Sequence, residues 1–142
     1  MSRKIFINLP VTDLGAAKSF YAALGFTEEP NFSDETAACM VWSETIMVML
    51  LTHAKWREFT ARPIPGKGSS EVMLALSFDD KAAVETVTEA AGANGGISDV
   101  NPAQDHGFMV SRAFADRDGH VWEAFWMDPA MAEAGTHEAS AA

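Results

Sequence analysis

The chain has 142 residues, of which 48% are hydrophobic and 21% are charged, and its formal net charge is −10. This length and composition are typical of one globular domain with a sizeable core. The acidic balance excludes the basic face that nucleic acid binding needs, and no run of about 18 apolar residues predicts a membrane span. The single cysteine, Cys39, excludes an internal disulfide, which fits a cytoplasmic protein.

The first half of the chain predicts a strand, a helix and three more strands. Residues 4–11 form the strand, Thr12 or Asp13 caps the helix, and Gly25 ends it at the C′ position. The apolar face of this helix is made of Leu14, Ala17, Phe20, Tyr21 and Leu24. The later elements are expected as strands over residues 27–32, 36–42 and 45–51 and a short helix over residues 54–61.

The second half repeats this order after a linker rich in Pro and Gly at residues 62–70. A strand over residues 71–78 leads to Asp79 or Asp80 as the cap of a second helix, which Gly92 is expected to end. The remaining elements are expected as strands over residues 97–101, 108–115 and 120–126, followed by a flexible tail over residues 129–142.

One offset aligns the two halves. Phe6 aligns with Met73, an offset of 67 residues (73 − 6 = 67), and the same offset aligns Asp13 with Asp80. A repeat of this period indicates two copies of one supersecondary unit, here βαβββ, that bury their faces together. We therefore expect the pocket of this protein to lie between the two copies.

Two motifs near the ends of the chain carry a family resemblance. The first covers residues 8–14 and 19–26, and the second covers residues 114–126, with the run DRDGH in its middle. Together with the repeat, they resemble the vicinal oxygen chelate superfamily, which includes glyoxalase I, bleomycin-resistance proteins and extradiol dioxygenases. The resemblance implies an α+β fold in which two βαβββ repeats form a curled mixed sheet around a cleft. It implies one domain over residues 1–128, with repeats at 4–61 and 71–128.

The same resemblance implies a divalent-metal site, but most of its ligands are replaced in this chain. Phe6 and Met73 stand where the resemblance implies histidines, and Met49 or Leu50 stands where it implies a glutamate. Of the four implied ligand positions, only position 123 still holds a metal-binding side chain, the carboxylate of Glu123. Because apolar and thioether side chains do not bind a hard divalent cation, we expect no metal cofactor at these positions.

Strand parity predicts which side chains line the cleft, because residues two apart on a strand share a face. Apolar walls broken by a few polar groups are typical of a small-molecule pocket. The expected ligand-binding residues are Phe6, Asn8, Met47, Met49, Met73, Ser77, Glu123 and Phe125. Trp122 and Trp126 alternate with Glu123 and are therefore expected against the helices. The alternative is that Phe6 and Met73 fill a closed core.

Three functions fit these residues. The first is a metal-free protein that binds a small aromatic or amphiphilic molecule, as the bleomycin-resistance branch does. The second is a lyase or isomerase in which Glu123 is the catalytic general base and Asn8 orients a substrate carbonyl. The third is a metal enzyme with a relocated site. Its candidate ligands share no strand face with Glu123; they are His53, His106, His120 and His137.

The expected partners follow from the same features. Two half-barrels leave open sheet edges, which proteins cover or pair, and members of the superfamily commonly pair as twofold dimers. We therefore expect a homodimer that binds a small-molecule ligand or substrate, and that binds neither nucleic acid nor a membrane.

Overall fold

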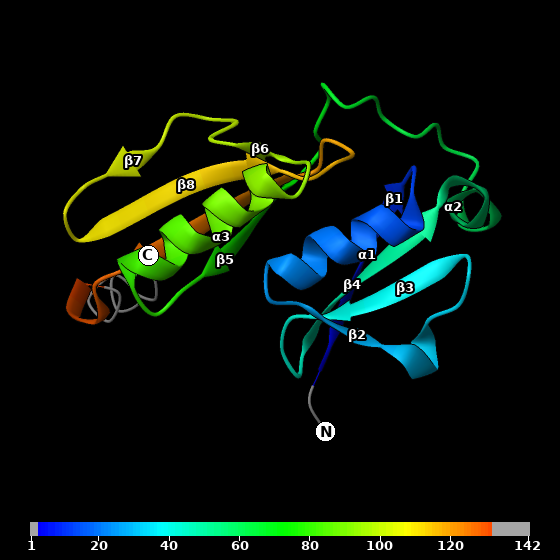
Figure 1. Ribbon diagram of the computed structural model, residues 1–142, viewed down its shortest axis with the longest axis horizontal. Coiled ribbons are helices and arrows are strands. Elements are labelled where there is room, and N and C mark those ends of the chain that lie inside the picture. Colours follow the sequence, from blue (N-terminus) through cyan, green and yellow to red (C-terminus); the bar gives the residue numbers. More distant parts are fainter. Residues whose placement is uncertain (1–2, 132–142) are drawn as a thin grey trace, which may run out of the picture.

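The computed structural model describes residues 3–131 and shows two repeats side by side, each an open mixed sheet with one long helix (Figure 1). The predicted α+β fold of two βαβββ units is confirmed, and neither sheet closes into a barrel. The tail expected over residues 129–142 falls mostly outside the described residues. No helix within residues 3–131 is long and apolar enough to cross a membrane.

The first repeat forms a four-stranded sheet in the order β1-β4-β3-β2. Its elements are β1 (Ile5–Val11), α1 (Leu14–Ala23), β2 (Thr27–Glu29), a 3-10 turn (Pro30–Phe32), β3 (Ala37–Val41), β4 (Ile46–Thr52) and α2 (His53–Phe59). Strand β1 is parallel to β4, and the other pairs are antiparallel. The expected strand over residues 27–32 is shorter because Pro30, which lacks a backbone donor, starts the 3-10 turn.

The second repeat forms a sheet in the order β5-β9-β8-β6, with β7 also paired to β8. Its elements are β5 (Met73–Ser77), α3 (Lys81–Ala93), β6 (Ile97–Ser98), β7 (Gln104–Asp105), β8 (Met109–Ala115) and β9 (Val121–Met127). Strand β5 is parallel to β9, as β1 is to β4. The expected strand over residues 97–101 is reduced to β6 because Asp99 has a φ of 55°, outside the extended region. The short strand β7 was not expected.

Both long helices begin where the repeat predicts. The carboxylate of Asp13 accepts a hydrogen bond from the amide of Ala16 at 3.0 Å, and Asp80 accepts one from Ala83 at 2.7 Å. These bonds satisfy amides that the first turn of a helix leaves without a partner. The two caps are therefore 67 residues apart (80 − 13 = 67), as the offset requires.

The helix ends differ between the repeats, and the prediction that Gly92 ends the second helix is wrong. Gly25 follows α1 with a φ of 106°, as expected for a C′ glycine. In the second repeat Gly92 lies inside α3, and Gly95, with a φ of 96°, is the residue that reverses the chain. Gly92 has another reason to be glycine: a Cβ there would lie 2.3 Å from the hydroxyl of Ser98.

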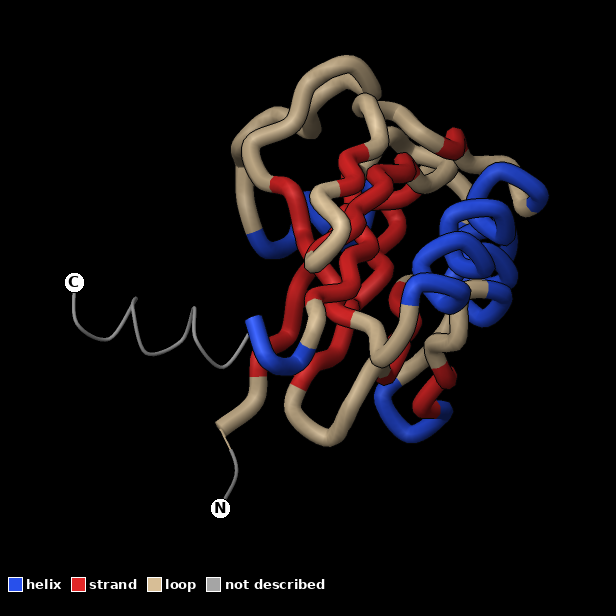
Figure 2. The backbone as a smooth tube through the Cα atoms, turned by 90° about the vertical axis from the view of Figure 1, so that its left-hand side faces the viewer, coloured by secondary structure: helices blue, strands red, loops and turns tan. Residues whose placement is uncertain are grey.

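The long helices cover one face of each sheet; the other face is largely open in the second sheet and only partly open in the first, where Cys39, Met47 and Leu51 are buried. In Figure 2 the long helical coils lie on one side of the strands. The covered faces share one core, whose largest side chains are Phe20, Tyr21, Phe26, Phe114 and Trp122. Trp126 packs against this core, so both tryptophans of the last strand face the helices, as parity predicted.

Candidate functional site

Glu123 lies in the middle of the open face of the second sheet. On β9 it is opposite Ala75 of β5 on one side and opposite Ala113 of β8 on the other. Two methyl side chains leave room around its carboxylate. The half-buried Glu123 has no hydrogen-bond or ion-pair partner within residues 3–131. Both of its acceptor oxygens are thus available on this face.

On the same face, the cross-strand neighbours on either side of the Ala75–Glu123–Ala113 row supply apolar and hydroxyl groups. In one row Phe125 is flanked by Ser77 and Ser111, and in the other Val121 is flanked by Met73 and Ala115. Met73 is 57% exposed, and the side-chain amide of Asn101 approaches its sulfur at 3.9 Å. Met73, Ser77, Glu123 and Phe125 therefore share one open face, as strand parity predicted.

The first sheet carries the matching face. Asn8 of β1 pairs with Met49 of β4, which pairs with Cys39 of β3. One row away, Phe6 pairs with Met47, and both line a cavity of about 510 Å³ together with Cys39. Phe6 is 51% exposed. The alternative that Phe6 and Met73 fill a closed core is therefore wrong, because neither side chain is buried.

The strand register also identifies the position in the first repeat that corresponds to Glu123. Glu123 pairs with Ala75, and Ala75 is 67 residues after Asn8 (75 − 8 = 67). Since Asn8 pairs with Met49, the equivalent of Glu123 is Met49 and not Leu50. Leu50 is fully buried on the helix-covered face.

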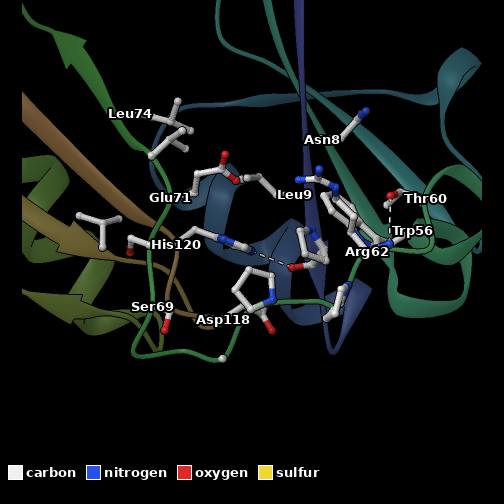
Figure 3. Close-up of a pocket in the computed structure, with 18 residues that line it drawn as sticks. Asn8, Leu9, Trp56, Thr60, Arg62, Ser69, Glu71, Leu74, Asp118 and His120 are labelled. Carbon is white, nitrogen blue, oxygen red and sulfur yellow. Dashed lines mark hydrogen bonds between the residues drawn. The ribbon is translucent and has the colours of Figure 1, made fainter.

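A larger cavity of about 570 Å³ lies between the repeats at the linker end of the molecule (Figure 3). Of the eight expected ligand-binding residues, Asn8 lines this cavity. Its other walls come from α2, the linker and the β8–β9 turn, and include Trp56, Arg62, Glu71 and His120. Trp56 and Arg62 carry no motif signal in the sequence, whereas His120 belongs to the DRDGH run and Glu71 to the strand expected over residues 71–78; none of the four was expected in the ligand site, because only the path of the linker brings them together.

The two repeats are joined at the DRDGH turn between β8 and β9. Thr12 donates two hydrogen bonds to the carboxylate of Asp118, from its amide at 2.9 Å and its hydroxyl at 2.8 Å. One ring nitrogen of His120, Nε2, lies 2.8 Å from the carbonyl oxygen of Pro10 and donates to it. These bonds fix the end of β1 against the second repeat.

A buried polar cluster forms the rest of this junction. The hydroxyl of Tyr21 donates to Asp116 at 2.6 Å and accepts from the indole N–H of Trp122 at 3.0 Å. Desolvation raises the pKa of Asp116 above its ordinary value. The pKa of Tyr21 is also raised, mainly by burial and to a smaller extent by the negative charge of Asp116. Sequence reasoning placed Tyr21 on the apolar helix face and missed this polar role.

The donor set of the open face does not fit the metal that the superfamily implies. The four equivalent positions hold Phe6, Met49, Met73 and Glu123, which offer one hard ligand. Within residues 3–131 no group of three or more His, Cys, Asp and Glu side chains is placed to hold a metal ion. His53 begins α2 and His106 lies in the turn before β8, away from Glu123, while His137 lies outside the described residues.

Comparison with known proteins supports the fold. Residues 3–43 match a family described as bleomycin resistance protein-like N-terminal. No curated protein matches the chain.

Solved structures of similar shape cover most of the chain. A hypothetical protein from S. aureus is 23% identical, with a TM-score of 0.74 over 89% of this chain and 95% of that one. A glyoxalase/bleomycin resistance protein/dioxygenase family enzyme from Burkholderia phytofirmans is 15% identical, with a TM-score of 0.72 over 89% and 99%. A glyoxalase-related enzyme from Fulvimarina pelagi is 20% identical, with a TM-score of 0.73 over 89% and 88%. The chain therefore has the glyoxalase/bleomycin resistance/dioxygenase fold, the fold that the sequence resemblance implied.

Proposed function

We propose that this protein binds a small organic cation with an apolar body on the open face around Glu123, without the usual metal of the superfamily. The single observation that carries the proposal is the carboxylate of Glu123, which stands between two alanines and has no partner within residues 3–131. A half-buried carboxylate with space around it favours a cationic ligand group, since a charge-assisted hydrogen bond is stronger than a neutral one.

The rest of the face supports the same ligand class. Phe125 and Met73 offer an aromatic ring and a flexible thioether, which make adaptable apolar walls. The net charge of −10 attracts cations over a longer range and repels anions. The family description that matches residues 3–43 names bleomycin resistance, so metal-free bleomycin is a natural first probe. Benzyltrimethylammonium is a second probe, since it carries only a cation and a ring.

The test is calorimetric titration of both probes into the wild type and into Glu123→Gln, in the presence of a chelator. We expect Glu123→Gln to weaken binding at least tenfold, or about 1.4 kcal/mol. Glu35→Gln is the matched control, because Glu35 is exposed in the turn before β3 and its loss changes the net charge equally. Equal binding by wild type and Glu123→Gln, or no binding of either probe, would contradict the proposal.

The same free carboxylate favours a second candidate, a lyase or isomerase in which Glu123 abstracts a proton. An enzyme of this kind would turn over its substrate, whereas a binding protein would not. If a substrate is found, Glu123→Gln should lower kcat by more than it changes KM, whereas a ligand anchor would change KM alone.

We further propose that the protein is a homodimer. Strands β1 and β5 are edges of their sheets, and their exposed apolar residues are Ile5, Phe6 and Met73, each more than 50% exposed. Exposed apolar edges are covered or paired in natural proteins. Light scattering at micromolar concentration should give a mass of twice 15.3 kDa, and a mass of 15.3 kDa would refute the dimer.

A further inference from the structure

The cavity at the linker end of the molecule has defined walls. The linker leaves α2, passes over the gap between the repeats and enters β5 (Figure 1). Its middle rests on the β8–β9 turn, where a Cβ on Gly119 would lie 2.6 Å from the carbonyl oxygen of Lys67 and 2.8 Å from its Cα. This close backbone contact holds the linker against the second repeat, so that it forms one wall of the cavity of about 570 Å³.

Two opposite charges face this cavity from the two ends of the linker. The guanidinium group of Arg62 and the carboxylate of Glu71 point toward one another across it (Figure 3). The ion pairs of residues 3–131 include neither side chain. A guanidinium binds a carboxylate well, and a carboxylate binds an ammonium, so each end of the cavity offers a site for one charge.

The cavity also has an apolar wall, beside polar lining residues that include Asn8, Asp118 and His120. The apolar wall is made of the ring of Trp56, the rings of Pro10 and Pro63, and the side chains of Leu74 and Val121. The indole Nε1 of Trp56 is buried and has no hydrogen-bond partner within the described residues. A cavity of this volume is in the range of small-molecule sites. The cavity thus combines a positive group, a negative group and an apolar wall.

We infer that this cavity binds a zwitterionic small molecule with an apolar body. The carboxylate of the ligand pairs with Arg62, its ammonium pairs with Glu71, and its body packs against Trp56. A ligand with one charge leaves the other end of the cavity without a counterion, whereas a zwitterion satisfies both. This site adjoins the face around Glu123, with which it shares Val121, but Glu123 itself does not line it, and Asn8 is the one expected ligand-binding residue that does.

Three matched probes test the inference. Phenylalanine carries both charges, 3-phenylpropionate lacks the ammonium group, and phenethylamine lacks the carboxylate. Binding is followed by fluorine NMR of protein labelled with 5-fluorotryptophan, which gives one resonance for each of the four tryptophans. Trp56→Phe assigns the resonance of Trp56. We expect phenylalanine to shift this resonance and to bind about tenfold more tightly than either analogue.

Charge variants then assign each end of the ligand. In Arg62→Gln, phenylalanine should bind no more tightly than phenethylamine, and phenethylamine binding should not change. In Glu71→Gln, phenylalanine should bind no more tightly than 3-phenylpropionate, and 3-phenylpropionate binding should not change. Arg57→Gln and Glu35→Gln are the controls, because both residues are exposed and outside the cavity.

A pair of glycine variants tests the linker wall. Gly119→Ala and Gly107→Ala both place alanine at a positive φ, 87° and 80°, so they carry similar backbone strain. Only the alanine at position 119 would clash with the linker backbone at Lys67, since nothing lies within 4 Å of a Cβ at position 107. We expect Gly119→Ala to weaken phenylalanine binding at least tenfold relative to Gly107→Ala.

Three outcomes would overturn the inference. The first is that no probe shifts the Trp56 resonance. The second is that all three probes bind equally to the wild type, which would mean that the charges do not select the ligand. The third is that Glu123→Gln abolishes the shift, because the ligand would then occupy the face around Glu123. Failure of the cation proposal for Glu123 would leave all of these measurements unaffected.

Discussion

Tyr21 and Asp116 are 95 positions apart in the sequence and are joined by a hydrogen bond of 2.6 Å between phenol and carboxylate. The other carboxylate oxygen of Asp116 accepts hydrogen bonds from the backbone amides of Asp118, at 2.9 Å, and His120, at 2.8 Å. Trp122 donates to the same phenol. One buried carboxylate therefore connects helix α1 of the first repeat with the β8–β9 turn of the second.

We predict that Tyr21→Phe lowers the unfolding free energy by about 1–3 kcal/mol, because it leaves a buried donor and a buried acceptor without a partner. The donor is the indole N–H of Trp122, and the acceptor is Asp116. Thr86→Val is the control, since it removes a hydroxyl that donates to Ala82 on the exposed side of α3. Thermal melting and urea titration measure both variants. A Tyr21→Phe variant as stable as Thr86→Val would show that the cluster is not a stabilising junction.

The same tyrosine predicts how stability depends on alkaline pH. Burial, then the charge of Asp116, raises the pKa of Tyr21 well above its ordinary value of 10.0. Above that ordinary value the unfolded chain loses the phenol proton while the folded chain keeps it. The folded state then binds more protons, so the unfolding free energy falls as pH rises.

Tyr21 is the single tyrosine of the chain, so tyrosinate absorbance reports this residue alone. We expect the absorbance to rise together with unfolding, followed by circular dichroism, and not at the ordinary pKa of a phenol. A tyrosinate signal that appears near pH 10.0 in a protein that is still folded would contradict the buried cluster.

Gly92 allows a test of helix packing in which two effects oppose each other. Alanine is the better helix former by about 1 kcal/mol, but a Cβ at 92 would displace the hydroxyl of Ser98 from its 2.8 Å bond to the carbonyl of Thr88. We therefore expect Gly92→Ala alone to give little or no stabilisation. In a Ser98→Ala background the hydroxyl is absent, and Gly92→Ala should stabilise by about 1 kcal/mol.

Chemical denaturation of the four proteins of this cycle measures the coupling. Equal effects of Gly92→Ala in both backgrounds would mean that Ser98 does not restrict position 92.

The last prediction concerns the replaced metal ligands. Phe6→His with Met73→His restores imidazoles on the open faces of β1 and β5, and Glu123 adds a carboxylate. Three protein ligands and one open position are sufficient for a catalytic type of zinc site. Because Phe6 and Met73 are 51% and 57% exposed, the two changes should cost little stability in the apo protein.

Zinc that binds only the folded state raises the melting temperature, so we expect zinc to stabilise the double variant and not the wild type. The two single variants are the controls, since each lacks one ligand of the set. A folded double variant that zinc does not stabilise would mean that the open faces of the two repeats do not converge on one centre.

The sequence by itself determined the features that depend on local periodicity. Asp13 and Asp80 cap their helices because a carboxylate reaches the amide three residues ahead wherever the chain turns into a helix. Glu123 and Trp122 point to opposite faces because side chains alternate along any strand. The offset of 67 therefore predicted both repeats, their order and the open face, without any knowledge of how the repeats pack.

Only the tertiary structure decided which distant groups meet. Tyr21 shows no polar signal on an apolar helix face, and its partner Asp116 comes close because the second repeat packs its β8–β9 turn under α1. Arg62 and Glu71 lie between α2 and β5, outside any helix or strand, and they face the same cavity because Lys67 rests on Gly119. Such contacts depend on the path of the whole chain, which short-range patterns of side chains do not encode.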